Sequence, residues 1–351
     1  MYQYELVKAA TKLLRDNMGL KKGETVCITA DTESHMDVVE ATAQAAYALG
    51  GKPMVITFAA PRGVGKAADP DLPMASLTAA LKETDIWIEY NYEWLLYSSA
   101  FDAAVAANTK LRYICLVGMT ADLLIRNIGR VRNKELGVFL RKAEEITKNA
   151  KCMRITTPAG TDLSFENMPG RDFYTSDGTV GPNEWKMMGG QISWSPKFET
   201  INGTLVFDGS MDPPSGLLRD KIVCTIVNGE VTKIEGGADA TALKEYLSSF
   251  NDPQMFRLAH ASYGFGPGAK LTGNVVEDER VWGSTEWGIG NVGPQLVSDI
   301  PGGIAGASHT DGICMSSTVY LDGELFLKDG EVVGPTPEVV ELARIARELE
   351  Y

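Results

Sequence analysis

The stretch that organises this sequence is residues 257–313. It reads RLAHASYGFGPGAKLTG over 257–273, EDERVWGSTEWGIGN over 277–291 and GASHTDGI over 306–313. Two of the chain's three histidines, His260 and His309, lie in it, and Asp311 follows His309 by two residues. Side chains at i and i+2 of a strand point to the same face, about 7 Å apart along the backbone. An extended His-Thr-Asp therefore presents two metal-ligand side chains together.

His260 offers a third ligand of the same kind. Two histidines and one carboxylate on one face leave open metal positions for substrate, water or O2. The alternative is a histidine–carboxylate hydrogen bond with a purely structural purpose. Glycines crowd both histidines, as expected where the backbone turns tightly or approaches a ligand. We predict a divalent metal site on His260, His309 and Asp311.

Composition narrows the class of protein. A chain of 351 residues is long enough for two domains. Its formal net charge of −13 argues against a nucleic-acid partner, because phosphate binding needs clustered Lys and Arg. No apolar run reaches membrane-spanning length, and five scattered cysteines without CxxC spacing indicate reduced thiols. We expect a cytoplasmic protein that acts on a small molecule, without nucleic-acid or membrane partners.

The two halves of the chain have different patterns. Up to residue 150, short apolar runs typical of buried strands alternate with helical patterns, which predicts a parallel, Rossmann-like α/β sheet. The predicted strands there are Glu24–Ala30, Pro53–Phe58, Asp85–Tyr90 and Leu111–Val117. From residue 151 onward, short strands and turn pairs such as Asn228-Gly229 predict a β-rich α+β domain that binds the metal. We place two domains at 1–150 and 151–351.

The run Tyr246–Pro267, YLSSFNDPQMFRLAHASYGFGP, and the HxD motif resemble a known group of enzymes. They are similar to the aminopeptidase T (thermophilic metalloprotease) superfamily, in its branch of 2,5-dihydroxypyridine dioxygenases. The resemblance implies a Rossmann-like N-terminal domain, a β-rich domain that carries the metal, and a homo-oligomer. It also implies that the iron ligands of the dioxygenases fall on His260, His309 and Asp311.

This sequence departs from both branches of the superfamily. Two histidines that the dioxygenases use for acid–base work have no counterpart, since Tyr97 stands at one position and Trp185–Met187 near the other. The aminopeptidases hold two metals, and Gln191 stands where they have the first glutamate. A neutral amide gives no charge for a second cation, so the resemblance favours one divalent metal ion (Fe, Zn or Mn).

The acidic residues near the histidines fall into two groups, candidate site residues and a solvent-facing run. Glu286, in a Gly- and Trp-rich segment, is either a catalytic base or metal ligand beside the ion, or a partner of backbone N–H groups in a glycine turn. Glu286 and Tyr97 are the catalytic candidates. By contrast, we expect the charge run Glu277–Arg280 to face solvent.

Aromatic residues were the candidates for substrate contacts. Trp185, Tyr263 and Trp287 are predicted to line an apolar pocket for a flat substrate, although aromatic residues in a β-rich domain also serve as core.

Three functions follow from these observations. The leading hypothesis is a mononuclear metal-dependent hydrolase, aminopeptidase-like in ancestry, that acts on a small amide, peptide or aromatic amine. The alternative is a non-haem Fe(II) ring-cleaving dioxygenase that acts on a dihydroxypyridine-like heteroaromatic. In a third hypothesis the protein is a metal-stabilised binding protein for a small ligand.

Overall fold

The computed structural model describes residues 3–351, which form two compact units. Unit 1 contains the described residues through Asn133, together with Gly178–Gly189 and Leu349–Tyr351; unit 2 contains Lys134–Asp177 and Gly190–Glu348. The division differs from the predicted boundary at residue 150. The long helix α6 (Asn133–Asn149) belongs almost wholly to unit 2, and a later segment returns to unit 1 because it adds a strand there.

Unit 1 is built on a parallel five-stranded sheet with the strand order β2-β1-β3-β4-β8. The sequence predicted the first four strands, but not β8, which comes from the returning segment. The mixed α/β architecture with a Rossmann-like first part is confirmed. The elements of unit 1 are α1 (Gln3–Lys12), β1 (Thr25–Asp31), α2 (Met36–Ala48), β2 (Lys52–Phe58), α3 (Met74–Glu83), β3 (Ile86–Glu89), α4 (Ser99–Ala107), β4 (Arg112–Cys115), α5 (Ala121–Leu124) and β8 (Glu184–Met187).

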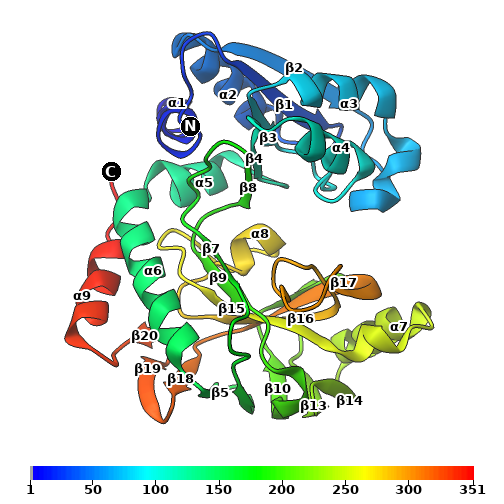
Figure 1. The fold of residues 1–351 in the computed structure, drawn as a ribbon, viewed down its shortest axis with the longest axis vertical. Helices are drawn as coiled ribbons and strands as arrows, with labels where there is room; N and C mark the ends of the chain where they lie inside the picture. Colours follow the sequence, from blue (N-terminus) through cyan, green and yellow to red (C-terminus); the bar gives the residue numbers. More distant parts are fainter. Residues whose placement is uncertain (1–2) are drawn as a thin grey trace. The chain divides into compact units, whose positions relative to one another are not determined.

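Unit 2 contains two antiparallel sheets (Figure 1). The eight-stranded sheet has the order β14-β13-β10-β6-β5-β18-β19-β20, and the seven-stranded sheet has the order β12-β11-β17-β16-β15-β9-β7. The strands are β5 (Cys152–Thr156), β6 (Asp162–Glu166), β7 (Phe173–Ser176), β9 (Gln191–Trp194), β10 (Asn202–Phe207), β11 (Ser210–Asp212), β12 (Gly216–Leu217), β13 (Ile222–Val227), β14 (Glu230–Gly236), β15 (Leu258–Gly264), β16 (Thr285–Val292), β17 (Ile304–Cys314), β18 (Thr318–Leu321), β19 (Glu324–Lys328) and β20 (Glu331–Val332). Besides α6, its helices are α7 (Ala238–Ser249), α8 (Val275–Asp278) and α9 (Pro337–Ala346).

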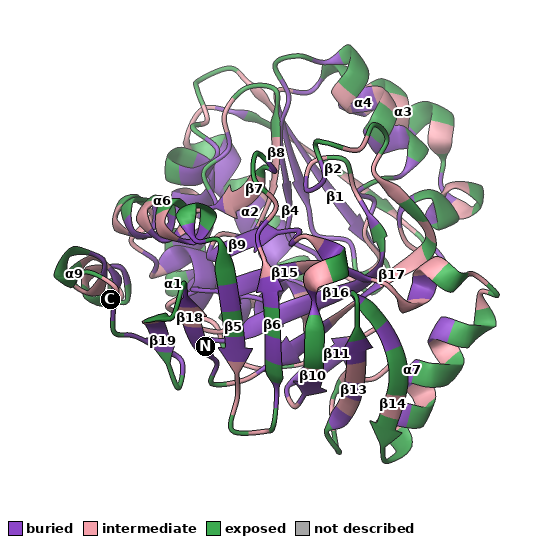
Figure 2. Cartoon of the chain, turned by 60° about the horizontal axis from the view of Figure 1, so that its bottom comes forward, coloured by how far each residue is buried: buried purple, intermediate pink, exposed green. Residues whose placement is uncertain are grey.

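Aromatic side chains join the two sheets of unit 2. Trp287 of β16 meets Phe165 of β6 edge to face at 5.4 Å between ring centroids, and Tyr263 of β15 meets Phe326 of β19 at 5.6 Å. Along β5 and β6, buried residues alternate with more exposed ones, which appear as bands in Figure 2. One face of each sheet is therefore committed to the shared core.

This packing corrects the prediction that Tyr263 and Trp287 contact a substrate. Neither side chain has exposed surface. Tyr263 is three residues from His260, and Trp287 is next to Glu286, so strand alternation points both rings away from the polar face that carries these two residues. Both belong to the core instead.

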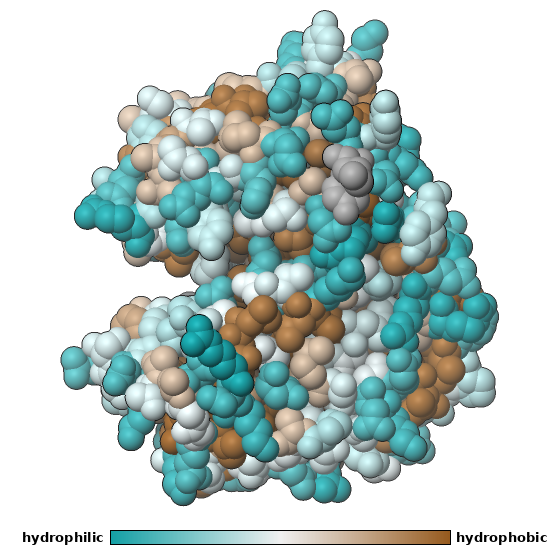
Figure 3. Space-filling view, turned by 180° about the vertical axis from the view of Figure 1, so that it is seen from behind, coloured by the Kyte–Doolittle hydropathy of each residue, from teal (hydrophilic) through white to brown (hydrophobic). Residues whose placement is uncertain are grey.

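Figure 3 shows both hydrophilic and hydrophobic side chains on one face of the surface. In the space-filling view, hydrophilic side chains cover much of the face shown and hydrophobic ones gather in smaller patches (Figure 3). Among the described residues, no helix has both the length and the apolar character needed to cross a membrane.

Removal of the indole that joins the sheets should destabilise unit 2. We expect Trp287→Ala to lower the free energy of unfolding by about 3–5 kcal/mol, because it leaves a cavity between the sheets, and to leave metal binding in place. Denaturant unfolding and metal analysis measure both. Tyr92→Ala is the control, since that side chain is 54% exposed and its loss should change stability by less than about 0.5 kcal/mol. An unchanged stability of Trp287→Ala would contradict the core assignment.

Candidate metal centre

Three neighbouring strands of the seven-stranded sheet bring the predicted metal ligands together. His260 lies on β15, while His309 and Asp311 lie on β17, and β16 runs between these strands (Figure 1). In the observed register His260 faces Gly288 of β16, and Gly288 faces Asp311. Antiparallel pairing thus aligns a histidine and an aspartate that are distant in the sequence.

The ligand atoms form a compact triangle. His260 Nε2 and His309 Nε2 are 3.1 Å apart, and Asp311 Oδ1 lies 2.9 Å from His309 Nε2 and 3.4 Å from His260 Nε2. Metal–ligand bonds of about 2.1 Å would place neighbouring ligand atoms about 3.0 Å apart at right angles and about 3.4 Å apart at tetrahedral angles. The three residues therefore fit one face of a single divalent ion.

Gly288 leaves the space that the His260 imidazole needs. A Cβ atom at this position would lie 2.5 Å from His260 Nε2 and 2.8 Å from the ring carbon Cδ2. Gly288 is not among the residues with positive φ, so its backbone conformation suits any residue and only space demands glycine. The sequence analysis missed this residue, although its place two residues after Glu286 on a strand was a usable signal.

Partners behind the ligands orient both imidazole rings. His309 Nδ1 lies 2.8 Å from the carbonyl oxygen of Asn291, so Nδ1 carries the proton and Nε2 is the free ligand atom. His260 Nδ1 lies 3.5 Å from Glu286 Oε1 and 3.5 Å from Ser262 Oγ. The side chain of His309 is 31% exposed and that of His260 is 12% exposed, so solvent reaches the ligand atoms on one side.

The ligand cluster shifts the pKa values of its members in different directions. Burial lowers the pKa of His260 and outweighs the effect of Asp311. Burial also opposes protonation of His309, but the charge and hydrogen bond of Asp311 raise the pKa of His309 above its usual value of 6.5. Although burial alone would raise it, the two histidines hold the pKa of Asp311 well below 3.8. Asp311 thus favours the protonated form of His309, and the two groups form an ion pair at a pH below the raised pKa of His309.

A second group of carboxylates adjoins the triad. Glu279, Glu286 and Asp311 each offer an oxygen atom, and these atoms lie within 4.8 Å of one another. Gln191 of β9 donates through Nε2 to Glu286 Oε2 at 2.7 Å and to Glu279 Oε2 at 3.1 Å, while its Oε1 accepts from Arg280 at 2.8 Å. This buried network joins two strands, β9 and β16, and the segment after α8 on one side of the triad.

The expectation that Glu277–Arg280 faces solvent is wrong. All four side chains are buried, and Arg280 has no exposed surface. Glu277 accepts hydrogen bonds from Lys270 N and Thr272 Oγ1, while Glu279 and Arg280 join the network of Gln191. Four adjacent charges resemble an exposed run in the sequence, and only partners elsewhere in the chain allow their burial.

Burial and crowding raise the pKa values of the two network glutamates. Burial is the main cause for Glu279, whose pKa rises to about 7 although Arg280 and Gln191 oppose the shift. For Glu286, burial together with the charges of Glu279 and Asp311 raises the pKa well above 4.5. Burial and crowding thus favour the protonated form of both carboxyl groups.

Two predicted site residues lie in the other unit. Tyr97 and Trp185 belong to unit 1, where their rings meet edge to face at 5.9 Å. Tyr97 is 45% exposed and has a positive φ of 67°. Catalytic and substrate-binding roles for these residues remain predictions that rest on the resemblance and on residue type.

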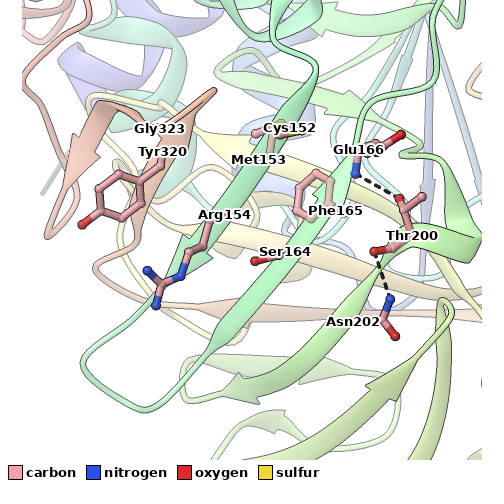
Figure 4. Close-up of a pocket in the computed structure, with 10 residues that line it drawn as sticks. All are labelled: Cys152, Met153, Arg154, Ser164, Phe165, Glu166, Thr200, Asn202, Tyr320 and Gly323. Atoms are coloured by element: carbon pink, nitrogen blue, oxygen red, sulfur yellow. Dashed lines mark hydrogen bonds between the residues drawn. The ribbon is translucent and has the colours of Figure 1, made fainter.

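A surface hollow of unit 2 lies on a different sheet from the triad. It has a volume of about 680 Å³ and shares no residue with the triad (Figure 4). Its charged Arg154 is already paired with Asp162, at 2.8 and 2.9 Å. No set of catalytic groups converges there, so the triad is the candidate site. The hollow is lined by Cys152, Met153, Arg154, Ser164, Phe165, Glu166, Thr200, Asn202, Tyr320 and Gly323.

The space beside His260 can be tested with one methyl group. We expect Gly288→Ala to abolish or strongly weaken metal binding without unfolding the protein, because the added Cβ would clash with the His260 imidazole and push its Nε2 out of the ligand triangle. Equilibrium dialysis with Fe(II) or Mn(II) measures the bound metal. Gly181→Ala is the matched control, since its Cβ would meet only the flexible end of Glu184, at 3.2 Å. Full metal occupancy in Gly288→Ala would contradict the geometry.

Metal binding should depend on pH through His309. A proton and a metal ion compete for Nε2 of His309, and Asp311 raises the pKa of that imidazole above 6.5. Metal affinity should therefore fall as the pH is lowered through the raised pKa, by up to about tenfold per pH unit. Titrations between about pH 6 and pH 8 measure this slope. An affinity that stays constant over this range would show that His309 is not a ligand.

Comparison with known proteins identifies the family. A family model described as 2,5-dihydroxypyridine 5,6-dioxygenase matches residues 5–334. A protein of that name from Pseudomonas putida KT2440 is 27% identical over 206 residues, which cover 55% of this chain and 57% of that protein. The match thus spans a little over half of the relative's length.

Two solved structures share the fold. The 2,5-dihydroxypyridine dioxygenase of Pseudomonas putida KT2440 superposes with a TM-score of 0.76 at 21% identity and covers 97% of this chain and 99% of its own. Wild-type AmpT from Thermus thermophilus superposes with a TM-score of 0.67 at 16% identity and covers 95% of this chain and 100% of its own. At these identities, both likenesses concern the fold alone.

These findings overturn the leading hypothesis of a metal-dependent hydrolase. Only a distant structural likeness connects the chain with the aminopeptidase, whereas the matching family model is that of the dioxygenases. Since that model spans nearly the whole sequence, the chain belongs to the 2,5-dihydroxypyridine 5,6-dioxygenase family.

Proposed function

We propose that this protein is an Fe(II)-dependent dioxygenase that opens a dihydroxypyridine-like ring. The observation that carries the proposal is the triangle of His260, His309 and Asp311, with the side-chain-free position of Gly288 beside it. Family membership supports the reaction class and the kind of substrate. Two histidines and one carboxylate with open positions are the ligand set typical of non-haem Fe(II) oxygenases.

In this proposal, His260 and His309 hold the ion through Nε2 and Asp311 holds it through Oδ1. Bound iron(II) supplies the redox chemistry that allows O2 to react with an aromatic ring. The ligand set carries a single negative charge, so one positive charge of a divalent ion is left to attract an ionised ring hydroxyl. The exposed side of His309 gives the substrate a path to this position.

Proton transfer in this protein must proceed without the histidines that the resemblance implies for its relatives. The third histidine, His35, precedes α2 in unit 1 and is exposed. Glu286 is the candidate that the geometry favours, because its carboxyl group is buried beside the triad, 3.5 Å from His260 Nδ1. Tyr97 is a second candidate, supported by the resemblance alone.

Assembly into a homo-oligomer is likewise proposed from the resemblance.

Oxygen uptake tests the reaction directly. We expect protein loaded anaerobically with Fe(II) to consume O2 when 2,5-dihydroxypyridine is added. The loss of the ring's ultraviolet absorbance should show that equal molar amounts of substrate and O2 are consumed. Protein loaded with Zn(II) should do neither, because zinc has no redox chemistry. Absence of O2 uptake in fully iron-loaded protein, with several dihydroxypyridine isomers, would contradict the proposal.

The histidines of the chain provide a matched comparison. We expect His309→Ala to reduce O2 uptake by more than about 100-fold, beyond the 10–100-fold loss typical of an outer partner of a ligand. His35→Ala should retain full activity, because His35 is exposed and lies in unit 1. Equal losses in the two variants would point to a general effect of histidine removal and would rule out the assigned ligand.

A further inference from the structure

The carboxylates of Glu279, Glu286 and Asp311 crowd one side of the triad. Their oxygen atoms lie within 4.8 Å of one another, and Glu279 and Glu286 are buried. Like charges this close repel strongly unless a cation or a proton compensates them. A second divalent ion would be one source of compensation.

Arg280 already brings a positive charge to this place. Its guanidinium group has no exposed surface, and one nitrogen donates to Glu279 Oε2 at 2.7 Å and to the carbonyl oxygen of Val276 at 2.6 Å. The other terminal nitrogen donates to Gln191 Oε1 at 2.8 Å. A buried guanidinium persists only with such partners, because desolvation of an unpaired charge is costly.

Gln191 connects Arg280 with the two glutamates through hydrogen bonds. Since its Oε1 accepts from Arg280, its Nε2 must be the donor, and that atom reaches both Glu286 Oε2 and Glu279 Oε2. The amide nitrogen is therefore shared by both carboxylates, at 2.7 and 3.1 Å. A glutamate at position 191 would instead add a fourth carboxylate.

We propose that Arg280, acting directly on Glu279 and through Gln191 on Glu286, takes the place of a second metal ion and limits the centre to one ion. The network also holds Glu286 against Gln191, with its other oxygen 3.5 Å from His260 Nδ1. Arg280 and Gln191 are thus positioning residues, which act on the site through the two glutamates. The inference rests on the proposed metal site, but it does not depend on the reaction with O2.

Metal stoichiometry tests this inference. Each protein is dialysed to saturation against Mn(II) and separately against Zn(II), and bound metal per chain is counted by elemental analysis. The wild type should hold one ion, and the double variant Gln191→Glu/Arg280→Gln should hold two. The single variant Gln191→Glu retains the guanidinium and should hold one.

A buried arginine elsewhere in unit 2 provides the matched control. Arg171 is 5% exposed and forms a bidentate pair with Asp299. Arg171→Gln also removes a buried guanidinium, and it should leave the count at one. Melting temperature is the second readout, because the double variant should gain thermal stability from the second equivalent of metal, whereas the wild type should gain it from the first alone.

The outcomes separate this inference from the proposed function. No metal in the wild type would remove the proposed function, and the inference would fail with it. Two ions in the wild type, or two in Gln191→Glu, would overturn the inference alone. One ion in a folded double variant would overturn it as well, and if that variant does not fold, the counts of wild type and Gln191→Glu decide.

Discussion

The candidate metal centre depends on a glycine, Gly288, in the middle of a sheet. Gly288 lies between His260 and Asp311 in the register of β15, β16 and β17, and a methyl group there would reach within 2.5 Å of the ligand nitrogen. Strand pairing can set two ligands on either side of a third strand, but the His260 ring can lie over that strand only if the strand contributes no side chain there. Glycine is therefore required at this position because it is small; the backbone conformation itself would accept another residue.

Side chains alternate between the two faces of the seven-stranded sheet, so the candidate site and the core lie on opposite faces. On β15 and β16, even-numbered residues such as His260 and Glu286 form the polar face, while the odd-numbered Tyr263 and Trp287 pack against the eight-stranded sheet. The aromatic core holds the strands in register, and the register holds the ligand triangle. A core change and a ligand change should therefore have different consequences even when the residues are adjacent in the chain.

Buried charged and polar side chains next to the triad form a hydrogen-bond network that holds Glu279 and Glu286 in place. An arginine, a glutamine and two glutamates satisfy one another beside the proposed ion. Such a network is stable only when each member finds its partner, since an unpaired buried charge is destabilising by several kcal/mol. The positive charge comes from Arg280, which bonds to Glu279 directly and reaches Glu286 through the neutral amide of Gln191.

The sequence by itself determined the local features of this protein. Period-two alternation put His309 and Asp311 on one face, and buried apolar runs located the first four strands of the parallel sheet. The same rule, applied to Tyr263 and Trp287, would have assigned them to the core. Tertiary structure alone decided which residues meet across the sheets: the return of β8 to unit 1, the position of Gly288 between two ligands, and the burial of Glu277–Arg280. These features depend on pairing between segments distant in the chain, and a local run of charges carries no sign of the partners that will bury it.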